Sequence, residues 1–94
     1  MQTMTEPQLI EKEQIPQLNF KKDIKIEQDE KLKEKLYEAM RLGNTFRGKT
    51  RIIFQDDEGL KQVETTVWAT GASYIALKGG VWLPISRIVG VQFL

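Results

Sequence analysis

The sequence predicts a mostly β protein: a small five-stranded antiparallel barrel, or a strongly curved sheet, with one N-terminal helix packed on it. From residue 46 onward, short runs of β-branched and aromatic residues alternate with turn signals, which is typical of antiparallel strands. The turns between these runs are too short for the crossovers that parallel strands require. One amphipathic stretch precedes the runs, and 94 residues provide one core at most. Residues 28–94 are therefore expected to form one domain of a helix and a small β-barrel.

The N-terminal residues divide into two segments. Residues 1–17 are rich in Gln, Glu, Thr and Pro, and Pro7 and Pro16 interrupt any helix, so we expect a flexible leader. In residues 18–27, apolar and polar side chains alternate with the period of two that is typical of strands. The apolar members are Leu18, Phe20, Ile24 and Ile26. This second segment is read equally well as an edge strand, a docking segment or a solvated linker.

A helix is predicted from about Glu30 to Leu42. Asp29 is a good N-cap residue before it, and Gly43 followed by Asn44 is a typical stop signal. Apolar side chains recur on one face at helical spacing, at Leu32, Leu36, Ala39 and Met40. Since the opposite face is charged, we expect the apolar stripe to cover a sheet.

Five strands are predicted, at about residues 46–55, 60–70, 73–78, 81–84 and 88–93. Polar or glycine-rich turns separate the first four of them, at residues 56–59, 70–72 and 78–80. Pro84 cannot continue a paired central strand, so residues 84–87 are read as a tight turn before the last strand.

Pairing the strands so that apolar residues share one face gives a single register. A hairpin closed around residues 56–59 places Ile52 opposite Val63. A three-residue loop at 70–72 then places Val67 opposite Ile75, and another loop at 78–80 places Ile75 opposite Leu83. The predicted core consists of the residues on the shared face: Ile52, Phe54, Val63, Val67, Ile75, Leu77, Val81, Leu83, Val89, Val91 and Phe93.

The same register gathers aromatic and basic side chains on the opposite face of the sheet. This candidate binding face consists of Arg47, Lys49, Arg51, Trp68, Tyr74, Lys78 and Trp82. Arg51 is expected to lie opposite Glu64 as a cross-strand ion pair. Three interpretations stay open. The protein's own helix or residues 18–26 cover the face, or the face binds a protein partner or a second copy of the chain, or it binds single-stranded nucleic acid, whose bases stack on aromatic rings.

Residues Gly43–Thr50 match the phosphate-binding pattern G-x-x-x-x-G-K-[ST]. In proteins that bind nucleoside triphosphates, a buried strand precedes this pattern, and a helix follows whose N-terminal N–H groups receive the phosphates. Here the order is reversed, because the predicted helix precedes the motif and a predicted strand follows it. We therefore expect no bound nucleotide, and no other cofactor is indicated.

The composition excludes several kinds of site. The chain has no Cys and no His, which removes disulfides, thiol nucleophiles and the usual zinc ligands. Ser73, Ser86 and the acidic turn at 56–59 lack a base or second carboxylate at a recognisable spacing, so neither an enzyme nor a metal site is expected. No segment has the pattern of a signal peptide or a membrane span, and we expect a cytoplasmic protein without membrane contact. The net charge of +1 is well below that of a typical nucleic-acid-binding domain.

Over residues 30–94, the order of elements resembles that of the Sm-like and Src-homology-3-type small barrels. The resemblance rests on a short helix, five strands, a long bent second strand and a tight turn before the last strand. Its carriers are Ile52-Ile53-Phe54, Gly59, Val63, Ile75-Ala76-Leu77, Gly80 and Leu83-Pro84-Ile85 with Ile88-Val89. Sm-like proteins that bind uridine-rich RNA carry an aromatic-x-Asn signature after the second strand, and Thr70–Ser73 departs from it. The peptide-binding barrels carry an acidic, tyrosine-rich first loop, which this chain lacks, so no functional residue is transferred.

The sequence therefore predicts a non-catalytic interaction module that binds a protein partner or itself through the candidate binding face. The alternative is an Sm-like barrel that binds RNA or single-stranded DNA.

Overall fold

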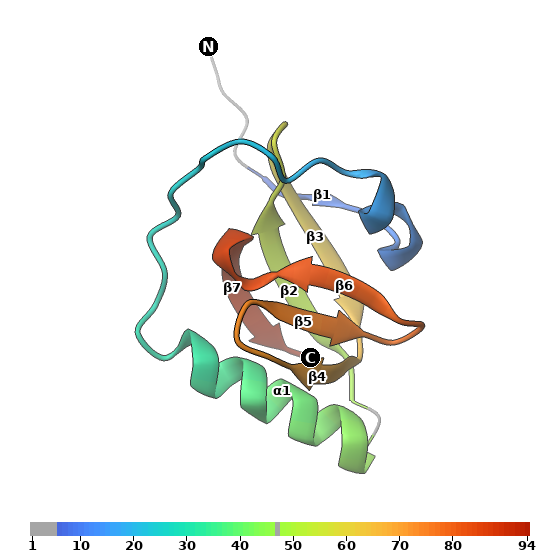
Figure 1. Ribbon diagram of the computed structural model, residues 1–94. Coiled ribbons are helices and arrows are strands. Elements are labelled where there is room, and N and C mark those ends of the chain that lie inside the picture. The colour runs from blue at the N-terminus through green and yellow to red at the C-terminus, as the bar shows by residue number, and fades with distance from the viewer. Residues whose placement is uncertain (1–5, 47) are drawn as a thin grey trace.

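The computed structural model describes residues 6–46 and 48–94. Within these residues the protein is mostly β, with one α-helix and seven strands in two sheets (Figure 1). The strands are β1 (Gln8–Leu9), β2 (Thr50–Gln55), β3 (Leu60–Thr65), β4 (Val67–Thr70), β5 (Tyr74–Leu77), β6 (Val81–Pro84) and β7 (Ile88–Phe93). The helical elements are α1 (Leu32–Phe46) and two 3₁₀ helices, η1 (Lys12–Gln17) and η2 (Ile85–Arg87).

The prediction of a small five-stranded antiparallel barrel or strongly curved sheet is wrong in the number of strands, and the barrel does not close within the described residues. The four-stranded sheet has the order β1-β3-β2-β7 and the three-stranded sheet has the order β4-β5-β6, and the described strands do not close into one barrel. The predicted strand 60–70 is divided at Thr66, so β3 and β4 belong to different sheets. The additional strand β1 comes from the N-terminal residues, where the sequence predicts a flexible leader. The mostly β architecture with one helix and a tight turn before the last strand is as predicted.

The predicted register is confirmed in two hairpins and wrong in the third. Ile52 pairs with Val63, and Ile75 pairs with Leu83, as expected. Val67, however, pairs with Leu77 and not with Ile75. The loop between β4 and β5 spans residues 71–73, one position later than expected, and Thr70 pairs with Ile75. The register shifts between Val67 and Ala69, which makes Trp68 the extra residue of a β-bulge.

A second bulge changes which side chains of β7 are buried in the core. The register between β2 and β7 shifts after Ile53, so that Phe54 pairs with Ile88. Ile88 is therefore fully buried, whereas Val89 and Phe93, both predicted in the core, are 37% and 46% exposed. Val81 is only partly buried at the edge of the core.

Gly43 does not end the helix, as the sequence predicts; α1 begins at Leu32 and continues to Phe46. A Cβ atom at Gly43 would lie 2.7 Å from Cγ2 of Thr66 and 2.7 Å from the carbonyl oxygen of Val67. The glycine is needed because α1 crosses the start of β4 in close contact. Asp29 lies just before the helix, where its side chain accepts a hydrogen bond from the N–H of Lys31 at 2.8 Å.

Residues 8–17, which the sequence assigns to the flexible leader, pack against the rest of the chain. β1 runs parallel to β3, and Ile10 donates its N–H to the carbonyl of Gln62 at 2.9 Å. Ile15 of η1 is 1% exposed and belongs to the core. Pro7 and Pro16 do not prevent order here. Pro16 lies inside η1, a 3₁₀ helix that contributes one buried apolar side chain.

Residues 18–27 form a docked segment and contain no strand. Leu18 and Phe20 pack against the core, and the ring of Phe20 lies 6.1 Å from that of Phe54. Between residues 18 and 31 the chain runs over the outside of the β structure to the start of α1 (Figure 1). Leu18 and Phe20 therefore dock on the core, and the edge strand considered for residues 18–27 does not form.

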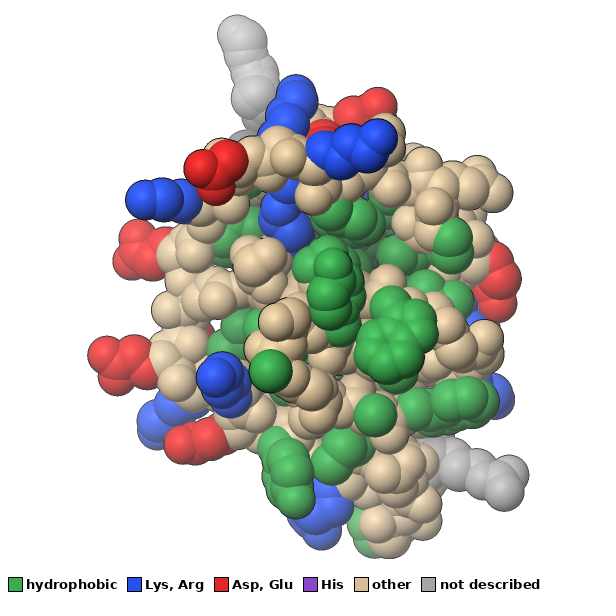
Figure 2. Space-filling model, viewed as in Figure 1, with side chains coloured by type: hydrophobic (Ala, Val, Ile, Leu, Met, Phe, Trp, Pro, Cys, Tyr) green, Lys and Arg blue, Asp and Glu red, His purple; other side chains and the backbone are tan. Residues whose placement is uncertain are grey.

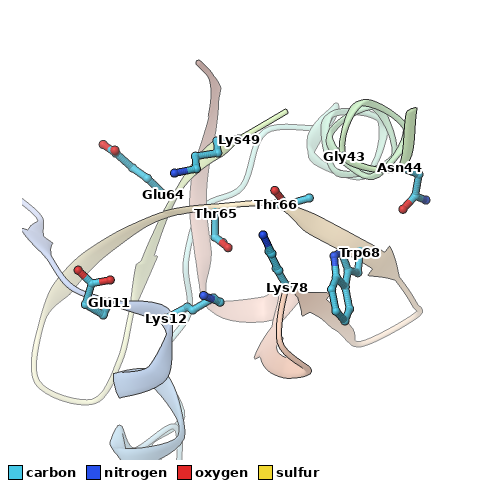
Figure 3. Close-up of a pocket in the computed structure, with 10 residues that line it drawn as sticks. All are labelled: Glu11, Lys12, Gly43, Asn44, Lys49, Glu64, Thr65, Thr66, Trp68 and Lys78. Atoms are coloured by element: carbon cyan, nitrogen blue, oxygen red, sulfur yellow. The ribbon is translucent and has the colours of Figure 1, made fainter. Parts of the chain in front are cut away.

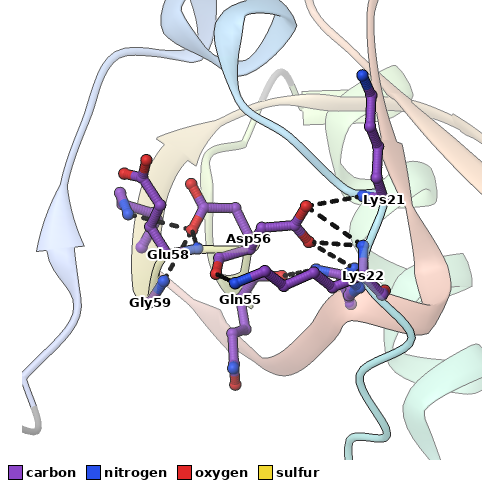
Figure 4. A network of polar contacts seen from close by, with 9 residues as sticks. Lys21, Lys22, Gln55, Asp56, Glu58 and Gly59 are labelled. Carbon is purple, nitrogen blue, oxygen red and sulfur yellow. Dashed lines mark hydrogen bonds and ion pairs between the residues drawn. The ribbon is translucent and has the colours of Figure 1, made fainter.

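A buried ion pair fastens this docked segment to the turn after β2. Asp57 accepts hydrogen bonds from the N–H groups of Lys21 and Lys22, at 2.9 and 3.1 Å, in the network of Figure 4. Its carboxylate also pairs with Arg87 at 2.9 Å, and Arg87 donates to the carbonyls of Gln55 and Lys22. Burial raises the pKa of the Asp57 carboxyl. The hydrogen bonds from Arg87 and the two N–H groups lower it by more than burial raises it, so the pKa lies below its ordinary value.

Candidate binding face and the adjacent groove

Trp68, Tyr74 and Trp82 lie on the outer face of the three-stranded sheet. Trp82 pairs with Ala76, and Tyr74 pairs with Pro84, as the predicted register requires. The bulge turns Trp68 outward at the neighbouring strand. We call these three rings, with Ala76 and Pro84 between them, the aromatic face. Figure 2 shows hydrophobic side chains gathered over this part of the molecule, with most charged side chains around the rim.

The described residues leave the aromatic face uncovered. Trp68, Tyr74 and Trp82 are 47%, 50% and 61% exposed. Helix α1 packs on β4 and β7 and leaves the rings of β5 and β6 free, and residues 18–26 do not cover them either. The interpretation in which the protein itself buries these rings is therefore wrong. The physical reason is that the apolar stripe of α1, with Leu32, Leu36 and Ala39 buried, packs into the core beside β4 and β7.

The basic residues of the candidate binding face do not gather around the three rings. Arg47 lies outside the described residues. Arg51 is on β2 of the other sheet, where it forms the predicted ion pair with Glu64 at 2.7 Å and also donates to Gln92 at 3.2 Å. Lys49 and Lys78 lie together in a groove that Trp68 also lines.

This groove has a volume of about 550 Å³. It lies between η1, the end of α1 and the bend between β3 and β4, and Figure 3 shows its lining side chains. They are Glu11, Lys12, Asn44, Lys49, Glu64, Thr65, Thr66, Trp68 and Lys78, together with Gly43. We call it the lysine groove, because three of its side chains carry ammonium groups.

The charges in the lysine groove are unevenly neutralised. The carboxylate of Glu64 is held by Arg51, and Lys12 pairs with Glu13 at 2.8 Å. Lys49 and Lys78 make no side-chain ion pair or hydrogen bond with any described residue. Two ammonium groups without a partner among residues 6–46 and 48–94 therefore line the groove.

Thr65 is a groove residue that the sequence analysis did not single out. It is only 5% exposed, yet its hydroxyl group makes no hydrogen bond with a described residue. In Figure 3 this hydroxyl points into the groove, toward the space that the side chains of Lys12 and Lys78 also approach. The paired threonines at 65 and 66, inside an otherwise apolar-alternating strand, are the sequence signal that could have indicated it.

The phosphate-binding pattern of residues 43–50 also borders this groove, through Gly43, Asn44 and Lys49. The order of elements is the reversed one that the sequence predicts, with α1 before the motif and β2 after it. The C-terminal end of α1, which carries the negative end of the helix dipole, therefore stands where a triphosphate-binding protein has a helix N-terminus.

A second, smaller hollow of about 350 Å³ extends the aromatic face beside Tyr74 and Pro84. It contains Ser73 and Ser86, the two hydroxyl residues weighed as nucleophiles, and no carboxylate lines it. Gln28 closes one side by donating to the carbonyls of Ile85 and Ile88 at 2.7 and 2.9 Å.

Among the described residues, no three His, Cys, Asp or Glu side chains are arranged to hold a metal ion. No helix in this part of the chain is long and apolar enough to cross a membrane. The chain matches no family model, no curated protein and no solved structure.

Proposed function

We propose that this chain is a non-catalytic interaction module that binds a protein partner, a second copy of the chain included, through its aromatic face. The observation that carries the proposal is the 61% exposure of Trp82 on β6, an edge strand of the uncovered three-stranded sheet. Tryptophan and tyrosine are the residues that most often anchor protein interfaces, since they bury a large area with few rotatable bonds. Contiguous apolar surface of this kind is uncommon on proteins that bind nothing.

The surroundings of the rings favour a protein partner for this face. The residues paired with Tyr74 and Trp82 are Pro84 and Ala76, both uncharged. A nucleic-acid platform needs cations beside the rings to follow the phosphates, whereas an interface core is depleted of charge. Lys49 and Lys78 lie in the lysine groove instead, beside Trp68 alone.

The arrangement of elements supports the resemblance to the small Sm-like and Src-homology-3-type barrels as part of the same proposal. Helix α1, the bend at Thr66 between β3 and β4, and η2 before β7 stand in the expected order. Barrels of this kind act mainly as binding modules. Ser73 and Ser86 lie in an open hollow whose lining contains no carboxylate base, which supports a role without catalysis.

The test compares Trp82→Ala with Tyr37→Ala, a matched variant because Tyr37 lies on α1 and is 60% exposed. Since Trp82 is mostly exposed, its removal should change the free energy of unfolding by no more than about 1 kcal/mol. Light scattering against concentration should show that any self-association of the wild type is lost in Trp82→Ala and kept in Tyr37→Ala. A loss of about 3 to 5 kcal/mol in Trp82→Ala would mean that the ring belongs to the core.

A nucleic-acid ligand is the second candidate, and the specific observation in its favour is the pair Lys49 and Lys78 beside Trp68.

A further inference from the structure

We propose that the lysine groove is a separate binding site for single-stranded nucleic acid. One backbone phosphate binds at Lys49, Lys78 and Thr65, and a neighbouring base stacks on Trp68. The site deepens the second candidate function and rests on it; it shares Trp68 with the aromatic face but uses neither Tyr74 nor Trp82.

Three hydrogen-bond donors that line the groove have no partner among the described residues. Lys49 and Lys78 have no ion pair with a described residue, although both line the same groove. A buried hydroxyl group without a partner normally costs free energy, and Thr65 is such a group, directed into the groove (Figure 3). An anion in the groove would accept hydrogen bonds from all three side chains.

The ring of Trp68 lies beside these donors. The bulge places its ring, 47% exposed, at the mouth of the groove, and Figure 3 shows the ring next to Lys78. A flat ring beside ammonium groups is the combination that single-strand binding proteins use, because rings stack on bases of any sequence and cations follow the phosphates. A carboxylate ligand would use the ammonium groups and leave the ring without a role.

The volume of the lysine groove and the charges that line it suit a nucleotide with a phosphodiester group. A volume of about 550 Å³ exceeds what one inorganic phosphate fills and is in the range of sites for a nucleotide-sized group. Two glutamates also line the groove, but Arg51 neutralises Glu64, which leaves Glu11 against the ammonium groups of Lys49 and Lys78. The C-terminal end of α1 disfavours the dense charge of a triphosphate, so a phosphodiester with a single charge suits the groove better.

The experiment measures fluorescence anisotropy of a labelled ten-nucleotide oligothymidylate and of the matching oligouridylate at about 50 and 200 mM salt. We expect saturable binding that weakens steeply with salt. The double variant Lys49→Gln/Lys78→Gln should bind at least about tenfold more weakly and show a smaller salt dependence. Trp68→Ala should also lose about tenfold or more in affinity.

Two controls keep the result specific. Lys33→Gln removes a charge from the exposed side of α1, and its affinity should stay within about twofold of the wild type. Thr65→Val removes only the hydroxyl group at nearly constant volume, so affinity should fall while urea denaturation shows a fold at least as stable. Trp82→Ala should keep oligonucleotide binding, which separates this site from the proposed protein interaction.

Four outcomes would overturn the proposal. The first is no saturable binding of either oligonucleotide at low salt. The second is equal loss in Lys33→Gln, which would indicate unspecific attraction. The third is that inorganic phosphate or a free mononucleotide competes as well as unlabelled oligonucleotide when both are supplied at the same concentration of phosphate groups. The fourth is equal competition by polyglutamate, which would assign the groove to an acidic protein segment.

Discussion

Gly43 shows how a single residue sets the position of a helix against a sheet. A glycine after an amphipathic stretch is typical of a helix end, which is why the sequence predicts a stop at Gly43. In the structure it lies within α1, because the backbone of Val67 and the methyl group of Thr66 leave no room for a side chain. Sequence periodicity contains no information on this approach, since β4 is more than twenty residues away in the chain.

The substitution Gly43→Ala should therefore destabilise the protein. Alanine favours a helix by about 1 kcal/mol over glycine, but overpacking a contact site costs about 1 to 3 kcal/mol, and here one of the contacted atoms is backbone, which cannot rotate away. Urea denaturation measures the net loss. Gly48→Ala is the control, because its Cβ would meet Leu42 at an ordinary 3.8 Å. A Gly43→Ala protein as stable as the wild type would contradict the close approach.

Asp57 gives a prediction on pH at the same scale. Its folded pKa is lowered, so the unfolded chain takes up the proton first as the pH falls. The stabilisation is complete above the ordinary Asp value of about 3.9 and is lost as the pH falls through the lowered folded pKa. Asp57→Asn should be less stable than the wild type at pH 7, and the difference should shrink below about pH 4.

Urea denaturation at pH 7 and pH 3 checks the expectation for Asp57. Asp23→Asn, an exposed carboxylate of the same docked segment, is the control and should match the wild type at both values. A difference between Asp57→Asn and the wild type that is the same at both pH values would show that the ion pair with Arg87 does not carry it.

At the scale of elements, the strands and turns from residue 50 onward could be predicted because alternation and glycine turns mark them locally. The two bulges could not. The loop at 71–73 begins one position later than expected, and with the bulge at Trp68 it leaves Val67 opposite Leu77. The bulge at Val89 places Ile88 in the core instead of Val89. Because side chains alternate with a period of two, a one-residue shift moves a side chain to the other face, and this is the case for Ile88 and Val89, whereas Val91 beyond the bulge stays buried. The pairs of Trp82 and Tyr74 survived because the hairpin between β5 and β6 is closed by Gly79 and Gly80, both at positive φ.

Helix η1 is the element that composition concealed. Residues 1–17 are polar enough on average to predict disorder, yet Ile10 and Ile15 complete the core and Lys12 lines the lysine groove. Ile15→Ala should cost about 2 to 5 kcal/mol of unfolding free energy, since its side chain is fully enclosed. Gln17→Ala, an exposed neighbour, should cost less than about 0.5 kcal/mol. Equal, small effects of both changes in urea denaturation would show that this segment is a leader that does not pack in the core.

For the whole molecule, the sequence supplied the residues of the aromatic face but not its surroundings. Trp68, Tyr74 and Trp82 could be placed together because they lie on neighbouring strands. The separation of Lys49 and Lys78 into a groove depends on η1, on the end of α1 and on the break at Thr66, which only the packed chain brings together. The sequence also could not exclude cover by α1, because its apolar stripe does not specify which strands it packs on, and in the structure these are β4 and β7.

If the aromatic face binds a partner, a probe on that face will be captured by it. A photoreactive phenylalanine derivative placed at position 74, which leaves Trp82 in place, or at position 37 of α1 as the matched exposed site, measures this by crosslinking in an extract of the source cells. We expect an adduct of defined mass at position 74 alone, removed by excess wild-type protein and not by excess Trp82→Ala. The same adducts at both positions, or none at position 74, would contradict a binding role for this face.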